Sequence, residues 1–220
     1  MEANLRAHPP RLLRAEAHHR RAAVGVVLVP MLSDSAHAAE PAPSPTGAPL
    51  GVDPGPESGS KHARRAAFVL TLRPATLRRH AGQWALPGGR LEADETPETA
   101  ARREIAEEIG LHLSPADILG RLDDFPSRSG HLISPFVMWA DLASAALLPN
   151  PNEVQAAFRV PLEDLDLPGN PRHEPLLHFA LVGSTVYAPT AAILYQFREL
   201  ALHARPVHVA DTEQPFFAWR

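Results

Sequence analysis

One helix is marked by its own sequence at both ends. Thr96 is a good N-cap residue, Pro97 suits the first helical position, and Gly110 stands where a C-terminal glycine cap belongs. Between these signals Ile105 and Ile109 recur one turn apart and continue an apolar stripe. The chain is therefore predicted to contain an amphipathic helix that packs one face against a core.

The other faces of this helix carry three glutamates, Glu104, Glu107 and Glu108. Like charges at i,i+3 and i,i+4 destabilise an isolated helix by roughly a few tenths of a kcal/mol per pair. The repulsion within such a cluster is relieved when the carboxylates take up protons, extend into solvent or bind a cation. Clustered carboxylate oxygens are the ligands that Mg²⁺ or Mn²⁺ prefers. A solvated acidic face is the ordinary alternative, and the surrounding residues decide between the two.

The composition limits the class of protein. A chain of 220 residues with 45% hydrophobic and 21% charged residues is long enough for one soluble domain with a core. Its net charge of −4 lacks the basic excess of a nucleic-acid binder. The absence of cysteine excludes disulfides and fits a reducing compartment. With no signal-peptide pattern at the N-terminus and only a short apolar run after it, we expect a cytoplasmic protein that binds neither nucleic acid nor membranes.

A segment rich in Pro, Ala, Gly and Ser, residues 33–62, separates two apolar β-like runs at 22–30 and 66–72. Almost nothing in it can pack into a core, so we expect a flexible insertion. The favoured arrangement is one sheet whose adjacent strands are joined by this long loop. The alternative, a separate N-terminal piece with a linker, is disfavoured because about 30 residues are too few for a domain.

The remaining chain alternates strand-like and helical patterns. A second amphipathic helix is expected over 190–204. The segment 152–165 is ambiguous and is interrupted at Pro161. Strands that alternate with two helices predict an α/β or α+β sandwich and exclude a bundle. The other expected strands are 66–73, 117–125 and 133–142, and a short strand is expected within 82–89, where it runs into a Pro-Gly-Gly turn.

The stretch from Gly89 to Leu111 resembles the signature of the Nudix hydrolases. That signature reads Gly-x5-Glu-x7-Arg-Glu-(apolar)-x-Glu-Glu-x-Gly-(apolar), and every fixed position is met. A pattern of this length rarely matches by chance. The resemblance implies an α+β fold, namely an α/β/α sandwich with a mixed sheet, on which a catalytic loop–helix–loop binds Mg²⁺ or Mn²⁺.

The resemblance also implies roles for single residues. Arg103 and Glu95 would form an ion pair that holds the helix to its loop, whereas a surface pair between Arg103 and Glu107 is the alternative. The general base stays open between Glu104 and Glu153, and a plain loop carboxylate is the alternative for Glu153. Metal ligation is implied for Glu104, Glu107, Glu108 and the backbone carbonyl of Gly89.

The residues before this signature, 70–89, resemble the extra motif of the coenzyme A pyrophosphatase branch, with departures at Pro74 and Leu86. Coenzyme A carries a 3′-phosphate besides its diphosphate, and cationic side chains suit both groups. Three later segments resemble the same branch: 129–137, 150–165 and 186–194. The substrate-binding residues implied are Arg73, Arg78, Arg79, His80, Gly82 and Gly88.

The function implied is a metal-dependent diphosphatase that splits coenzyme A or acyl-coenzyme A into 3′,5′-ADP and 4′-phosphopantetheine or its acyl form. A Nudix hydrolase for ADP-ribose or another nucleoside diphosphate derivative is the alternative, and a non-catalytic nucleotide-sensing module is the remote one. We expect an N-terminal extension over 1–20, a Nudix domain over 21–205 with its insertion at about 33–63, and a tail over 206–220. A homodimer is compatible with these expectations, and the oligomeric state and the number of ions stay open.

Overall fold

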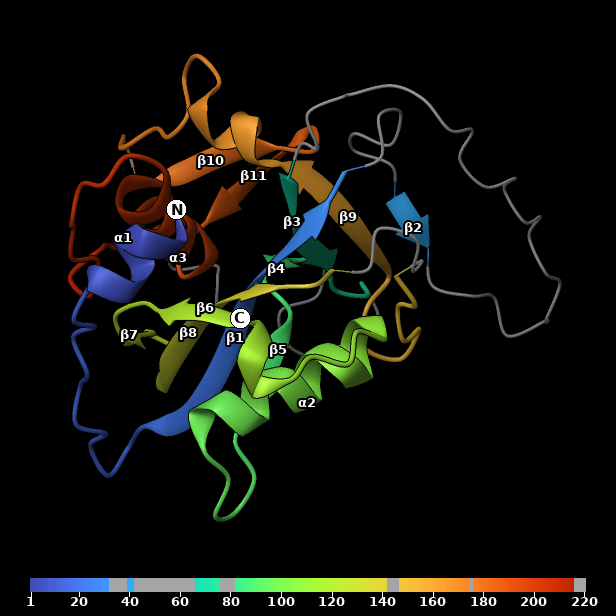
Figure 1. The fold of residues 1–220 in the computed structure, drawn as a ribbon, viewed down its shortest axis with the longest axis vertical. Helices are drawn as coiled ribbons and strands as arrows, with labels where there is room; N and C mark the ends of the chain where they lie inside the picture. The colour runs from blue at the N-terminus through green and yellow to red at the C-terminus, as the bar shows by residue number, and fades with distance from the viewer. Residues whose placement is uncertain (32–38, 42–65, 76–81, 142–146, 175, 216–220) are drawn as a thin grey trace, which may run out of the picture.

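The computed structural model shows a mixed β-sheet with helices on both faces (Figure 1). Most of the predicted insertion lies outside the described residues, as do Arg78, Arg79 and His80 of the predicted substrate site. The described residues are 1–31, 39–41, 66–75, 82–141, 147–174 and 176–215.

The central strand of the sheet is β1 (Arg20–Pro30). It runs antiparallel to β3 (Ala66–Leu72) and parallel to β8 (His131–Trp139), so the sheet is mixed as predicted. Because β1 and β3 are adjacent, the expectation of one sheet interrupted by a long connection is confirmed. The order is β2-β9-β3-β1-β8-β6, and the other members are β2 (Ala39–Pro41), β6 (Ile118–Arg121) and β9 (Ala156–Pro161).

Short strands extend this sheet within 82–90 and over 118–126. The short strand expected within 82–89 is β4 (Trp84–Ala85), which pairs with β3, and the glycines of the expected turn begin a further short strand, β5 (Gly88–Arg90), which pairs with β1. The expected strand over 117–125 is divided into β6 and β7 (Phe125–Pro126), both paired with β8. The register shifts along β6, and the following aspartates bind the N-terminal segment, so one continuous ladder does not form.

The predicted helix is α2 (Pro97–Ile109), and its end signals act as expected. The Thr99 N–H donates to the side chain of Thr96, and Gly110 adopts the left-handed conformation with φ of 74°. Its apolar stripe packs on one face of the sheet, where Ile105 and Ile109 are fully buried. A Cβ at Gly25 of β1 would lie 2.6 Å from Ile105 Cδ1, so glycine lets the helix approach the strand closely.

The opposite face of the sheet is covered by α3 (Thr190–Phe197), which continues as the π-helical turn η3 (Arg198–Leu202). The short helix α1 (Glu2–Ala7) packs beside them, as Figure 1 shows, and its Leu5 is buried. Neither α1 nor the hairpin of β10 (His178–Leu181) and β11 (Ser184–Tyr187) was predicted. The 3-10 turns are η1 (Pro115–Asp117) and η2 (Leu162–Asp166), and η2 follows β9 at the predicted break.

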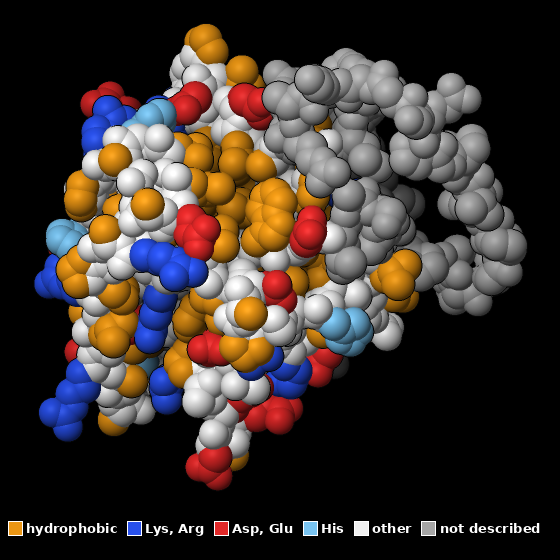
Figure 2. Space-filling view, in the orientation of Figure 1, with side chains coloured by type: hydrophobic (Ala, Val, Ile, Leu, Met, Phe, Trp, Pro, Cys, Tyr) orange, Lys and Arg blue, Asp and Glu red, His pale blue; other side chains and the backbone are white. Residues whose placement is uncertain are grey.

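The surface carries charges of both signs. On the face seen in Figure 2 the basic side chains gather mainly at the left of the view, and acidic ones lie over its middle. Within the described part of the chain, no helix has the length and apolar character needed to cross a membrane.

Candidate functional site

A cavity of about 1130 Å³ lies where β1, β4, β5 and the end of α2 meet the hairpin β10–β11 and α3. Its wall includes Glu104 and Glu108 of α2, Arg73 at the end of β3, and Glu153 from the loop before β9. Gly82, Gly88 and Gly89 of the predicted site also line it. Residues far apart in the chain therefore meet at one opening.

Glu108 is the most buried acid of this cavity, with 4% of its side chain exposed. The Gly88 N–H donates to its Oε2 at 2.9 Å, and Arg73 Nη1 lies 3.6 Å from its Oε1. Burial removes water from the carboxylate and raises its pKa to about 8, although the Gly88 N–H and Arg73 both oppose this change. A cation that replaced the lost hydration would keep Glu108 ionised.

Three carboxylates converge beside Gly88. One oxygen each of Glu104, Glu108 and Glu153 lies within 4.8 Å of the others. Burial also raises the pKa of Glu104, against the effect of Arg103. Glu153 reaches the group because its loop is tied to α2: the Asn150 N–H donates to the Glu108 carbonyl at 2.9 Å. This carboxylate-only set suits a hard divalent cation such as Mg²⁺ or Mn²⁺.

Glu107 lies outside this group. Half of its side chain is exposed, and its Oε2 accepts a hydrogen bond from Arg103 Nη1 at 3.1 Å. Residues 104 and 108 lie one turn apart on the same face of the helix. Glu107 is also near this face, but its side chain extends into solvent and toward Arg103. The acid that joins Glu104 and Glu108 in the structure is Glu153. Ligation by Glu107 stays a prediction, and these contacts do not support it directly.

Arg103 joins the helix to the loop before it. Its Nε and Nη2 donate to the two carboxylate oxygens of Glu95, both at 3.0 Å, and its Nη2 also donates to the Arg90 carbonyl. Its Nη1 reaches Glu104 at 2.9 Å as well as Glu107. The hydrogen bonds from Arg103 lower the pKa of Glu95, and those to Glu95 raise the pKa of Arg103. Both pairings weighed from the sequence are thus present, and this cation relieves part of the glutamate repulsion.

The glycines of the Pro-Gly-Gly turn let this network close. A Cβ at Gly89 would fall on the Glu104 carboxylate, so a side chain there would displace an acid of the cluster. Trp84 lines the cavity and also packs edge-on against Phe158, with ring centroids 5.0 Å apart. It therefore contributes both to the core and to the wall of the site.

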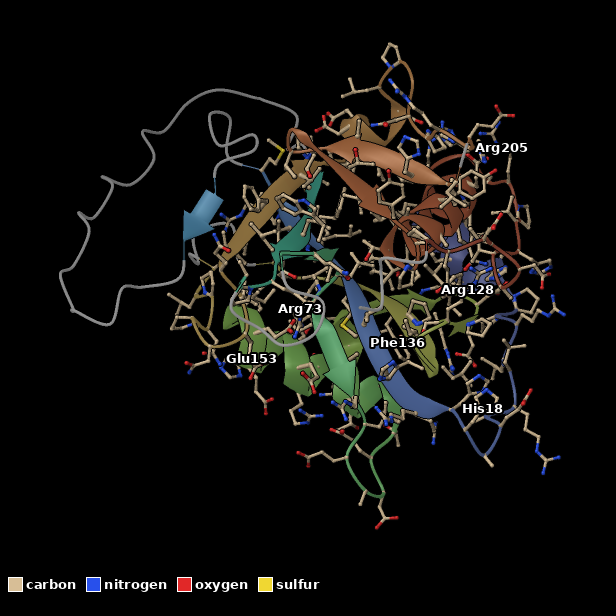
Figure 3. The ribbon with its side chains drawn as sticks, turned by 180° about the vertical axis from the view of Figure 1, so that it is seen from behind. His18, Arg73, Arg128, Phe136, Glu153 and Arg205 are labelled. Carbon is tan, nitrogen blue, oxygen red and sulfur yellow. The ribbon has the colours of Figure 1, made fainter. Side chains whose placement is uncertain are left out.

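Other wall residues were not assigned to the site from the sequence, although Tyr187 and Thr190 lie in the segment 186–194 that resembles the coenzyme A pyrophosphatase branch. Tyr187 and Thr190 come from the unpredicted hairpin and from α3, and Gln214 comes from the expected tail. Arg128 lies apart from Arg73 and Glu153 in Figure 3 but lines the same cavity. No local pattern relates these residues to the carboxylates, so only the fold could bring them to this opening.

The raised pKa of Glu108 predicts how the stability of the metal-free protein depends on pH. The folded state keeps this proton to a pH of about 8, whereas the unfolded chain releases it near the ordinary value of 4.5. Since the folded state binds more protons in this window, the free energy of unfolding should fall as the pH rises from about 4.5 to about 8. Each unit of pKa difference contributes about 1.4 kcal/mol at most.

Urea unfolding at several pH values, in the presence of a chelator, measures this dependence. Glu108→Gln removes the titrating group and should make the curve flatter than that of the unchanged protein. Saturating Mg²⁺ should reverse the trend, because metal binding requires the ionised carboxylate. The same dependence of stability on pH in the unchanged protein and in Glu108→Gln would contradict a raised pKa of Glu108.

Two curated proteins match part of this sequence. The chain is 38% identical over 97 residues to Nudix hydrolase 15, mitochondrial, of Arabidopsis thaliana (43% of this chain, 34% of that protein). It is also 38% identical over 101 residues to the uncharacterized Nudix hydrolase NudL of Photorhabdus laumondii (46% of this chain, 54% of that protein). The chain thus spans about half or less of the length of these relatives.

Among solved structures, the chain is similar to the NUDIX domain of Shewanella oneidensis NrtR complexed with ADP ribose. The TM-score is 0.48 and the identity 16%, over 90% of this chain and 96% of that one. The family model of the NUDIX domain matches residues 61–179, which is more than half of the chain and includes the loop, helix α2 and the carboxylate cluster. The chain therefore belongs to the NUDIX domain family.

Proposed function

We propose that this chain hydrolyses the diphosphate bond of a nucleoside diphosphate derivative with the help of Mg²⁺ or Mn²⁺, and that coenzyme A or acyl-coenzyme A is that derivative. The observation that carries the proposal is the convergence of Glu104, Glu108 and Glu153 in a large cavity, next to the guanidinium of Arg73. Acidic and basic groups side by side suit a metal ion and the phosphates that it would bind.

The residues of the cluster fit a divalent cation. All three offer carboxylate oxygens, and Glu108 is buried in surroundings that disfavour its ionised form unless a positive charge is near. When bound, such an ion supplies Lewis-acid chemistry, because it neutralises phosphate oxygens and makes water more acidic. Glu104, Glu108 and Glu153 would hold it.

The residues of the chain then have distinct tasks in the proposed reaction. Water attacks one phosphorus of the diphosphate, the bond from that phosphorus to the bridging oxygen breaks, and two phosphomonoesters result. Glu104 or Glu153, whichever is not fully engaged as a ligand, would accept the proton of the attacking water. Arg73 would bind phosphate oxygens, since its Nε is buried and has no hydrogen-bond partner among the described residues. Arg103 would keep Glu104 in place.

Support for coenzyme A comes from the motif over 70–89, which resembles that of the coenzyme A pyrophosphatases. Arg73 and Gly82 of this motif line the cavity, whereas Arg78, Arg79 and His80 lie outside the described residues. Leu86, one of the two departures, has 4% of its surface exposed and packs in the core. We further propose a cytoplasmic location, which the absence of cysteine supports.

A product assay tests the proposal. The protein is incubated with Mg²⁺ or Mn²⁺ and with coenzyme A, acetyl-coenzyme A, ADP-ribose, NADH or a nucleoside triphosphate, and the products are separated by chromatography. We expect 3′,5′-ADP together with 4′-phosphopantetheine or its acyl form, and no product in the presence of a chelator. Cleavage of ADP-ribose with coenzyme A intact would refute the coenzyme A assignment and retain the diphosphatase. No cleavage of any compound would refute both.

A further inference from the structure

The floor of the cavity runs along β1 and has two chemically different ends. Side chains alternate along a strand, so Arg20, Ala22 and Val24 all face the cavity. Val24 pairs with Gly88, whose N–H donates to Glu108, so this end lies at the carboxylate cluster. Arg20, four residues away, marks the other end, roughly 13 Å along the strand. We call this the basic end, and its residues are Arg20, Arg128 and His131.

The carboxylates of the cavity lie at one end only, whereas its arginines do not: Arg73 stands beside Glu108, and Arg90 lines the wall next to Ala22. Among the described residues of the wall, the carboxylates are Glu104, Glu108 and Glu153, and all three belong to the cluster. Arg20 pairs with His131 across β1 and β8, so both side chains lie on the cavity side of the sheet. Between the two ends the floor is apolar: Ala22, Val24 and Ile133.

Hydrogen bonds hold the basic end in place. The backbone N–H of Arg128 donates to the side-chain oxygen of the buried Gln214, and Arg128 Nη1 donates to the Gln214 carbonyl at 3.1 Å. The buried Ser127 accepts from the His131 N–H at 3.0 Å, and the Ser129 hydroxyl lies 3.1 Å from His131 Nδ1. The Arg20 N–H donates to the Gly130 carbonyl. The C-terminal tail and the turn before β8 therefore position Arg128 at the rim of the cavity.

We propose that the basic end binds a second phosphate of the same ligand, a phosphate monoester on the sugar of the nucleoside. The apolar floor would accommodate the nucleoside between the two anionic groups. A guanidinium group can bind two phosphate oxygens at once, and the wall has arginines but no described carboxylate at the basic end, which favours a ligand with a second phosphate there. This inference rests on the proposed function, because it assumes that the diphosphate lies at the carboxylate cluster. It assigns recognition of the extra phosphate to Arg20 and Arg128.

Equilibrium binding tests this subsite without requiring hydrolysis. Isothermal titration of the full chain with Mg²⁺ compares adenosine 3′,5′-bisphosphate with adenosine 5′-monophosphate. We expect the bisphosphate to bind roughly tenfold more tightly or better, since hydrogen bonds to charged groups are among the stronger ones. Arg128→Gln and Arg20→Gln should remove most of this preference. Arg128→Lys, which keeps the charge without the planar fork, should retain part of it.

The matched control is Arg14→Gln, because Arg14 is an exposed arginine outside the cavity and the preference should survive its substitution. The hydrogen bond from the backbone N–H of Arg128 to the Gln214 side chain does not need the guanidinium, so the turn should stay folded in Arg128→Gln. The melting temperature of this variant checks that expectation. Equal affinities of the unchanged protein for the two nucleotides, or a preference unaffected by both glutamine variants, would overturn the subsite. Tighter binding of the bisphosphate than of the monophosphate, without any cleavage of coenzyme A, would instead refute the proposed reaction and leave the subsite standing.

Discussion

Glu108→Gln should lower kcat by about three orders of magnitude or more, while the protein remains folded. The substitution removes one negative charge from a cluster whose oxygens lie within 4.8 Å of one another, and with it one ligand for the divalent cation. The amide oxygen of glutamine can still accept the hydrogen bond from the Gly88 N–H. Because Glu108 is buried, a neutral side chain should not destabilise the metal-free protein at neutral pH.

Two variants on the same helix sharpen this test. Glu98→Gln is the matched control, since Glu98 is half-buried in the first turn, pairs with Arg102 and lies outside the cavity, and the kcat of this variant should stay unchanged. Glu107→Gln should have a much smaller effect than Glu108→Gln, because Glu107 contacts Arg103 and lies outside the cluster. Steady-state kinetics on the substrate found in the product assay, together with titration of Mg²⁺, measure both effects. A Glu108→Gln protein with full activity and unchanged Mg²⁺ affinity would remove this residue from the metal site.

Gly88→Ala should destabilise the fold by about 3 kcal/mol or more. Gly88 has φ of 148°, a conformation that residues with a side chain rarely adopt. A Cβ there would also collide with the backbone of β1 at the Ala23 carbonyl and at Val24 Cα. Neither contact can move without breaking the pairing of β5 with β1, which also holds the N–H that binds Glu108.

Gly82→Ala distinguishes the cost of backbone strain from the cost of a steric clash. Gly82 also has a positive φ, of 64°, but a Cβ there would meet no described atom within 4 Å. Its substitution should therefore cost only about 1 kcal/mol, from backbone strain alone. Urea unfolding of both variants measures the difference. Similar losses of stability for the two variants would show that the tight packing of Gly88 on β1 does not matter.

The helix and its chemistry could be predicted because their signals are local. The N-cap of Thr96 and the left-handed Gly110 act within a few residues, so neighbouring side chains suffice to place both ends of α2. The ion pair of Arg103 with Glu95 also spans few residues. The strands β1 and β3 could be expected from their apolar runs, and their adjacency is confirmed despite the long segment between them.

Other features depend on contacts between distant segments. The hairpin β10–β11 has only four residues in each strand, and α1 has six residues, so neither carries a strong periodic pattern. Leu5 of α1 is buried because it packs against Gly120 of β6, where a side chain would interfere. Gln214 reaches Arg128 from the other end of the chain. Such contacts form only after the sheet has brought the segments together.

The carboxylate cluster shows where the two kinds of information divide. The sequence alone determined that three acids stand on α2 beside a Pro-Gly-Gly turn, because helix caps and glycine turns are set by neighbouring residues. Tertiary structure decided which acids meet: the loop hydrogen-bonded to the Glu108 carbonyl brings in Glu153, whereas Glu107 contacts Arg103 and lies outside the cluster. It also decided that Glu108 is buried and that the carboxylates of the cavity lie at one end, away from Arg20 and Arg128. Burial and the placing of distant charges depend on packing, which no short stretch of the chain specifies.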